Sequence, residues 1–165
     1  AIHLTLKFLG DVGEQQVGPI AAALSEVARG HETFTLEVGG VGVFPNRRST
    51  RVLWVGIAGD LSRLWSLQGH VDESLAALAF ARDRRQFSPH LTVARLRDGT
   101  PAAARRVAAE TLFAAGFHPE HHFRVEVVSL MRSTLHPTGA VYERLALAPL
   151  KDGAPGGIGG RETAC

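Results

Sequence analysis

The chain has 165 residues, which is enough for one ordinary globular domain, or two small lobes with a shared core, and too few for two large domains. Its 45% hydrophobic and 21% charged residues are typical of a folded soluble protein, and no apolar run approaches the roughly 20 residues of a transmembrane helix. The formal charge of +2 excludes a strongly basic protein that coats nucleic acid. The single cysteine, Cys165, cannot form a disulfide within the chain, which favours the cytoplasm, and we expect a monomer.

The spacing of apolar residues predicts the secondary structure. Alternating apolar and polar side chains indicate strands, and apolar residues at every third or fourth position indicate helices. Asp60 and Thr100 are predicted N-caps, and Gly30 is a predicted helix stop. In chain order, the predicted elements are a strand at 2–9, a helix at 17–29, strands at 34–38 and 51–57, a helix from 60 to about 78, a strand at 88–96, a helix at 100–116, and strands at 123–131 and 140–147.

The two halves of the chain, about 2–58 and 88–148, repeat one order of elements: a His-x-Thr strand, a helix and two strands. This repeat predicts an α+β fold with two pseudo-symmetric lobes, one from each repeat. Each lobe would be an antiparallel sheet with outer helices, and the lobes would face each other across a central cleft. Residues 1–150 would form this single bilobal domain. Residues 151–165 are glycine-rich and poor in large apolar side chains, so we expect a disordered tail there.

The two repeats differ in what precedes them. The second His-x-Thr strand follows a predicted strand and helix at 51–80, whereas the first stands at the beginning of the chain. Symmetry predicts a strand and helix of about 40 residues before Ala1, so the first lobe is expected to be truncated on its N-terminal side. Without these elements, one sheet edge and one core face would be uncovered.

Each repeat carries one histidine and one threonine two positions apart, namely His3 with Thr5 and His90 with Thr92. On a strand such positions share a face and lie about 6.6–6.8 Å apart, so the imidazole and the hydroxyl can reach one phosphate. Histidine titrates near neutral pH and can act as acid or base, while threonine hydroxyls can donate to phosphate oxygens. Two such strands facing each other predict an in-line displacement at phosphorus that needs neither a metal nor another cofactor. A third copy, 136–138, contains a proline and is interpreted as a turn between strands.

Other side chains are candidates to complete this site. Arg95 can neutralise charge on the phosphate, but strict alternation points it away from the second motif unless the strand ends or bulges there. Lys7 shares a face with the first motif and is the alternative cation. Phe44 is a candidate for stacking on a nucleobase, and a place in the core fits it equally well. We expect Trp54 and Tyr142 to pack between helices and sheet.

Arginines form two groups along the chain. Arg47, Arg48 and Arg51 make up the first, and Arg82, Arg84 and Arg85 make up the second, just before the second motif. Each group fits either a solvated surface or a local contact with nucleic acid.

The segments His3-Leu-Thr5-Leu-Lys-Phe-Leu-Gly and Ser88-Pro-His90-Leu-Thr92-Val-Ala-Arg95 resemble the paired signatures of a known family. It is the bacterial and archaeal RNA 2′,3′-cyclic phosphodiesterase family, also called the 2′-5′ RNA ligase family, within the two-histidine phosphoesterases. The resemblance runs from Ile2 to about Leu150. It implies hydrolysis of RNA 2′,3′-cyclic phosphate ends to 2′-phosphomonoesters, with His3 as proton donor to the leaving 3′ oxygen and His90 as the base that activates water. It also implies that Thr5, Thr92 and Arg95 hold the phosphate.

Three functions remain open at this point. The first is hydrolysis of RNA with cyclic phosphate ends, tRNA fragments among them. The second is 2′-5′ RNA ligation by the same site, in which an RNA hydroxyl replaces water. The third is a non-catalytic RNA-binding module, which would need the basic groups but not both histidines. The presence of both histidines favours catalysis.

Overall fold

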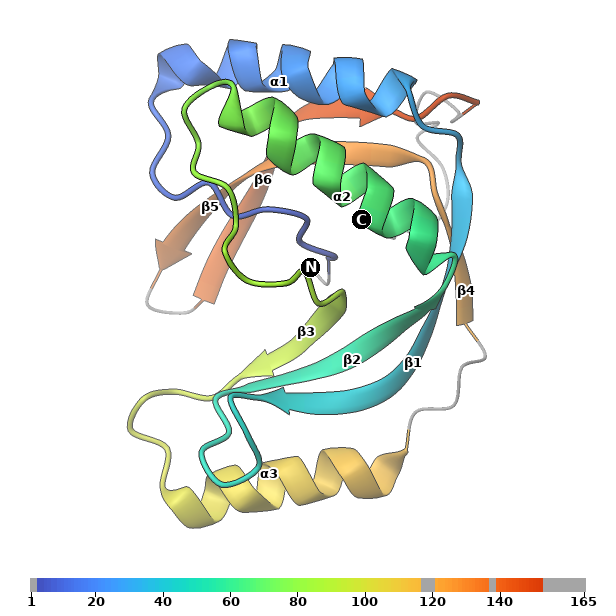
Figure 1. The fold of residues 1–165 in the computed structure, drawn as a ribbon. Coiled ribbons are helices and arrows are strands. Elements are labelled where there is room, and N and C mark those ends of the chain that lie inside the picture. Colours follow the sequence, from blue (N-terminus) through green and yellow to red (C-terminus); the bar gives the residue numbers. More distant parts are fainter. Residues whose placement is uncertain (1–2, 117–120, 137–138, 153–165) are drawn as a thin grey trace.

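The computed structural model describes residues 3–116, 121–136 and 139–152, and it has the predicted α+β composition (Figure 1). Its strands form two antiparallel sheets: a four-stranded sheet in the order β3-β2-β1-β4, and a hairpin of β5 and β6. In chain order the elements are α1 (Glu14–Arg29), β1 (Phe34–Phe44), β2 (Val52–Gly59), α2 (Leu61–Ala76), β3 (His90–Arg95), α3 (Ala102–Ala115), β4 (His121–Val125), β5 (Val127–His136) and β6 (Gly139–Pro149).

The two sheets do not follow the two sequence repeats. Strands β1 and β2 of the first repeat pair with β3 and β4 of the second, whereas α1 of the first repeat packs on the hairpin of the second. The predicted α+β class with antiparallel sheets is confirmed, but the two sheets are not built one from each repeat. The predicted strand at 123–131 is divided at Glu126, where the chain passes from the four-stranded sheet to the hairpin. The buried positions change phase there, from Val125 to Val128, so one alternation does not continue through the segment.

The main core lies between the two helices of the first half and both sheets. α1 and α2 pack against each other on the side of the four-stranded sheet where the hairpin lies, and α3 lies on the opposite side (Figure 1). Both helices bury one stripe at helical spacing, as predicted. The fully or nearly fully buried side chains of these elements include Ile20, Leu24, Leu36, Leu64, Leu67, Val71 and Leu75.

The amino-terminal segment is not the strand that its alternation predicts. Its one bridge among the described residues joins Leu4 to Leu91 of β3, and the chain bends at Leu6. The bend changes the phase of burial: Phe8 is 81% exposed, although alternation places it with Leu4, while Leu9 packs against the core. The segment is therefore attached to the fold largely through side chains.

The carboxyl-terminal end of the described chain is paired with the loop after α1. Lys151 forms a parallel bridge with Glu32, and its N–H donates to the carbonyl of His31 at 2.8 Å. Lys151 thus belongs to the fold and not to the predicted tail, while residues 153–165 lie outside the described residues. Within the part of the chain that the structure describes, no helix is long and apolar enough to cross a membrane.

Candidate active site

The two His-x-Thr segments lie side by side, the second in β3 at the edge of the four-stranded sheet and the first next to it (Figure 1). Because Leu4 and Leu91 form an antiparallel bridge, each histidine lies opposite the threonine of the other motif. The facing pairs are His3 with Thr92 and Thr5 with His90. All four side chains point to the face opposite the two leucines, since side chains alternate along a strand.

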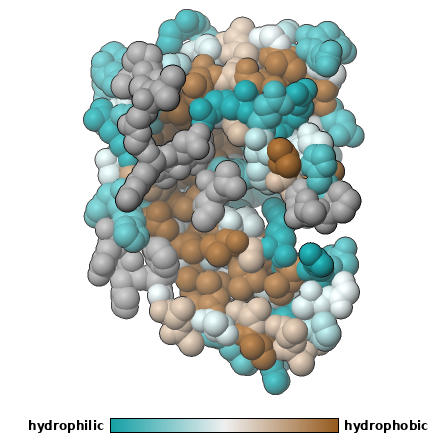
Figure 2. Space-filling model, turned by 180° about the vertical axis from the view of Figure 1, so that it is seen from behind, coloured by the Kyte–Doolittle hydropathy of each residue, from teal (hydrophilic) through white to brown (hydrophobic). Residues whose placement is uncertain are grey.

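This register fixes the approximate size of the site. Facing residues in an antiparallel pair have Cβ atoms about 4.5–5.5 Å apart, and diagonal neighbours are about 7–8 Å apart. The two histidines are the diagonal neighbours, and each has a threonine opposite it. A tetrahedral phosphate fits between two imidazoles at this separation, with a hydroxyl on either side. In the view from behind, a notch at mid-height separates the upper part of the molecule from the lower part (Figure 2).

A bulge in β3 turns Arg95 toward the same face. Ala94 and Thr92 pair with neighbouring residues of β2, so Val93 between them is an extra residue in the ladder. The partners of His90, Thr92 and Arg95 on β2 are Gly56, Trp54 and Val52, which are spaced two apart and share one face. Arg95 is exposed on the side of His90 and Thr92. The bulge is the departure from strict alternation that a contact between Arg95 and the phosphate requires.

Each histidine ring rests against an aromatic side chain from a different sheet. His3 contacts Tyr142 of β6 edge to face, with 4.8 Å between ring centroids. His90 contacts Phe44 of β1 edge to face at 5.0 Å, and Trp54 of β2 at 6.0 Å. Because aromatic pairs prefer this edge-to-face arrangement, these contacts restrain the orientation of both imidazoles.

Trp54 lies flat on the sheet because the residue opposite it on β1 is Gly42, which has no side chain. A Cβ added at Gly42 would overlap the Trp54 ring, and one at Gly56 would approach the Gly39 carbonyl oxygen to 2.6 Å. Trp54 and Tyr142, which were expected to pack between helices and sheet, both touch a motif histidine. Gly42, opposite Trp54 on β1, and Gly56, two residues further along β2 on the same face, are the sequence signal for this position.

The backbone near His90 fixes which of its nitrogens carries a proton. Nδ1 of His90 lies 2.7 Å from the carbonyl oxygen of Ser88. A carbonyl oxygen can only accept a hydrogen bond, so Nδ1 donates and Nε2 presents a lone pair. This tautomer is the one that can take a proton at Nε2.

Lys7 is a structural ion-pair partner, not the phosphate-binding cation that its position in the sequence predicts. Its ammonium pairs with the carboxylate of Asp72 on α2, and it also donates to the carbonyl of Ala81 at 2.7 Å. The Lys7 side chain is only 3% exposed. The charge is already balanced, and the bend at Leu6 directs this side chain toward α2.

Among the described residues, the second arginine group contacts α2 and not the histidines. Arg82 pairs with Glu73 of α2 at 3.1 Å, and residues 81–86 form an exposed connection between α2 and β3. The described residues also hold no group of three or more histidine, cysteine, aspartate or glutamate side chains arranged to bind a metal ion.

The fold resembles solved structures over most of the chain. The crystal structure of TT0787 from Thermus thermophilus matches with a TM-score of 0.70 and 25% identity, covering 91% of this chain and 78% of that one. The crystal structure of E. coli LigT complexed with 3′-AMP matches with a TM-score of 0.66 and 24% identity, covering 90% of this chain and 76% of that one. The architecture is therefore that of the LigT fold.

Sequence relationships define the family. The model of the 2′-5′ RNA ligase superfamily matches residues 1–137. Two curated relatives are called RNA 2′,3′-cyclic phosphodiesterase: one from Methanothermobacter thermautotrophicus, 37% identical over 86% of this chain and 74% of its own, and one from Archaeoglobus fulgidus, 38% identical over 87% and 77%. This chain belongs to the 2′-5′ RNA ligase superfamily.

Proposed function

We propose that this chain hydrolyses RNA 2′,3′-cyclic phosphate ends to 2′-phosphomonoesters by acid–base catalysis between His90 and His3. The observation that carries the proposal is the shared face of the two His-x-Thr motifs, with Nε2 of His90 free to accept a proton. The activity in the names of the two archaeal relatives points to the same substrate. We expect the reaction in the cytoplasm, in line with the cysteine content.

The reaction needs one base and one acid on opposite sides of phosphorus. Nε2 of His90 takes a proton from water as the water oxygen attacks phosphorus. The bond from phosphorus to the 3′ oxygen breaks in line, and protonated His3 gives its proton to that oxygen. The 2′ ester bond remains. His90 then releases its proton to solvent and His3 takes one up, so both histidines return to their starting states. Each histidine contributes roughly 10²–10⁴-fold to the rate.

The other residues on this face hold the phosphate and the nucleoside. The hydroxyls of Thr5 and Thr92 donate to the non-bridging oxygens, and the guanidinium of Arg95 balances the charge that grows on them. Phe44 is half-buried beside His90, where one side of its ring can stack on the terminal base. This set of donors provides charge stabilisation from side chains, so we propose that the reaction is independent of metal ions.

Ligation is the second candidate function, because an RNA 5′-hydroxyl can replace the attacking water. It rests on the family to which the chain belongs, and the same base and acid would serve it. The basic turn at 45–51, beside the site, could receive a second RNA strand. tRNA fragments with cyclic ends are substrates for either reaction. A non-catalytic module is less favoured, since simple RNA binding would not need two histidines on one face.

The test is a product analysis in the presence of EDTA. The protein is incubated with a nucleoside 2′,3′-cyclic phosphate, and the products are separated by chromatography. The expected product is the 2′-monophosphate, at a rate that chelation does not change. A loss of activity on chelation, or a product that is entirely the 3′-monophosphate, would contradict the mechanism.

A further inference from the structure

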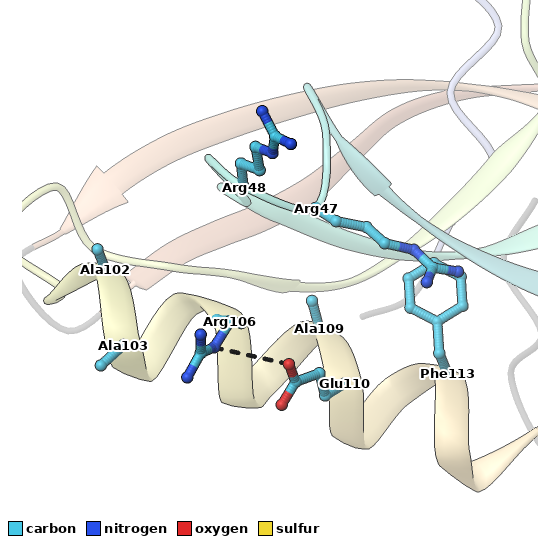
Figure 3. Close-up of a pocket in the computed structure, with 8 residues that line it drawn as sticks. All are labelled: Arg47, Arg48, Ala102, Ala103, Arg106, Ala109, Glu110 and Phe113. Atoms are coloured by element: carbon cyan, nitrogen blue, oxygen red, sulfur yellow. Dashed lines mark ion pairs between the residues drawn. The ribbon is translucent and has the colours of Figure 1, made fainter.

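A basic groove lies between the turn at 45–51 and α3, outside the histidine site (Figure 3). It has a volume of about 620 Å³. Its floor on α3 consists of small side chains, which leaves the space open, and its rim is formed by charged ones. The lining residues are Arg47, Arg48, Ala102, Ala103, Arg106, Ala109, Glu110 and Phe113.

The turn that forms one wall of the groove is held rigidly. The Asn46 side-chain oxygen accepts hydrogen bonds from the backbone N–H groups of Arg48 and Ser49, both at 3.0 Å. Arg105 of α3 donates to the carbonyl of Thr50 at 2.8 Å and to the carbonyl at position 97, also at 2.8 Å. The turn and the helix are thus fixed to each other, so the groove exists before any ligand binds.

Positive charge is concentrated around this groove. Segments 45–51 and 95–106 hold seven arginines and one aspartate, in a chain whose net charge is only +2. Arg47 stacks over the Phe113 ring at 3.7 Å, while Arg48 is exposed on the turn. One carboxylate lines the groove: Glu110 lies 3.6 Å from Arg106. The groove therefore favours a ligand with several negative charges.

The turn at 45–51 connects the groove to the proposed active site. β1 ends at Phe44, whose ring lies 5.0 Å from His90, and the turn begins at the next residue. On the other side of the turn, Arg51 precedes β2, and its carbonyl accepts from the N–H of Leu96, next to Arg95. Exposed guanidinium groups thus lead from the phosphate position around the end of the sheet to α3.

We propose that this groove binds the phosphodiester backbone of the RNA strand on the 5′ side of the cyclic end. The proposal rests on the proposed function and names its substrate class: an oligonucleotide several residues long, whose additional phosphates the groove would hold. Arginine forks match phosphate oxygens, and a positively charged groove beside aromatic side chains is how proteins hold single strands without reading sequence.

The test compares two substrates and two matched variants. Arg48→Gln/Arg106→Gln removes two exposed charges from the groove and leaves Arg47 on Phe113. Arg29→Gln/Arg132→Gln removes two exposed charges from α1 and β5 and serves as the control. Activity is measured on a cyclic mononucleotide and on a ten-nucleotide RNA with a cyclic end. Binding of a labelled ten-nucleotide RNA with a 3′-phosphate, which has no ring to open, is measured by fluorescence anisotropy.

The groove variant should bind the ten-nucleotide RNA about tenfold more weakly at low salt and lose about 1.4 from the slope of log Kd against log salt, at about 0.7 per lost contact. Its kcat/KM on the mononucleotide should equal that of the control. Glu110→Gln should tighten RNA binding. Equal Kd values for the two double variants would overturn the inference, whatever the activity. An inactive wild type that still shows the difference in Kd would instead count against the proposed function alone.

Discussion

The two histidines are supported in different ways by the two parts of the molecule. His90 belongs to β3, which pairs with β2 along its length, and its Nδ1 is fixed by a backbone carbonyl. His3 belongs to a segment with a single bridge, and its position depends on the Tyr142 ring and on the ion pair of Lys7 with Asp72. Backbone ladders tolerate many side-chain changes, whereas individual contacts do not. The His3 side should therefore be the more sensitive to mutation.

The largest effect is expected from removing either imidazole. His3→Ala and His90→Ala should each lower kcat by roughly 10²–10⁴-fold, because each removes one proton-transfer group. His136→Ala, at the third His-x-Thr copy where β5 ends, should leave kcat unchanged and is the control. Steady-state kinetics on a cyclic mononucleotide measures all three. If RNA binding persists and neither motif histidine affects turnover, the binding-module function is correct.

The next effect tests the support of His3. Lys7→Met leaves the largely buried Asp72 carboxylate without its main partner and should cost about 3 kcal/mol of the free energy of unfolding, as broken buried ion pairs do. The double variant Lys7→Met/Asp72→Leu should recover most of that loss, because it leaves no unpaired charge. Urea titration measures stability. If the double variant is as unstable as the single one, the ion pair itself is not what holds the segment.

A smaller effect tests the support of His90. Gly42→Ala should lower the free energy of unfolding by about 1–3 kcal/mol, because the added methyl group overlaps Trp54 and must displace it. Gly69→Ala in α2, where an added Cβ meets nothing within 4 Å, should raise stability by about 1 kcal/mol. Thermal unfolding compares the two. Equal effects of both substitutions would show that Trp54 is free to move off the sheet.

The smallest effect is a pH dependence of stability, which comes from His31 after α1 and its neighbour His70 on α2. Burial, and then repulsion from His70, lower the pKa of His31 below its usual 6.5. Below that pH the unfolded chain takes up a proton that the folded chain does not, so stability should fall as pH falls from 6.5 toward the lower folded pKa. His31→Asn should remove this slope in urea titrations across that range. A slope that persists in His31→Asn must come from another group.

A second loss of stability is expected in stronger acid. Burial raises the pKa of Asp72. The hydrogen bonds from Lys7 and the Asp83 amide, together with the charges of Lys7 and Arg82, lower it by more, so the pKa is below its usual 3.8. Its stabilisation is present above pH 3.8 and lost as pH falls through the lower folded value. When the urea titrations are continued below pH 3.8, Asp72→Asn should lack this second loss of stability.

The sequence was sufficient to predict those parts of the fold in which the structure of an element depends on its own residues. α1 and α2 bury the stripes that their spacing predicts, and the alternation at 88–96 predicts the strand that carries His90. It was insufficient where the partner lies far along the chain. Asp72 is 65 positions from Lys7, and nothing near Lys7 in the sequence indicates that contact. Similarly, the assignment of β4 and β5 to different sheets depends on neighbours, not on local pattern.

The pairing of His3 with Tyr142 and of His90 with Trp54 shows the same limit. Aromatic residues in strands fit a core equally well, and their role here depends on which strands become adjacent. The orientation of Arg95 could not be predicted for a related reason. It depends on an extra residue in the strand, which alternation alone cannot show.

The bulge at Val93 has a consequence for comparing sequences. In this chain the arginine stands three positions after the motif threonine, and only the added residue gives it the same orientation as the histidine. A relative whose arginine stands two positions after that threonine would reach the same orientation with a regular strand. One missing residue in an alignment at this point therefore records a change in strand geometry and not the loss of the proposed phosphate-binding arginine.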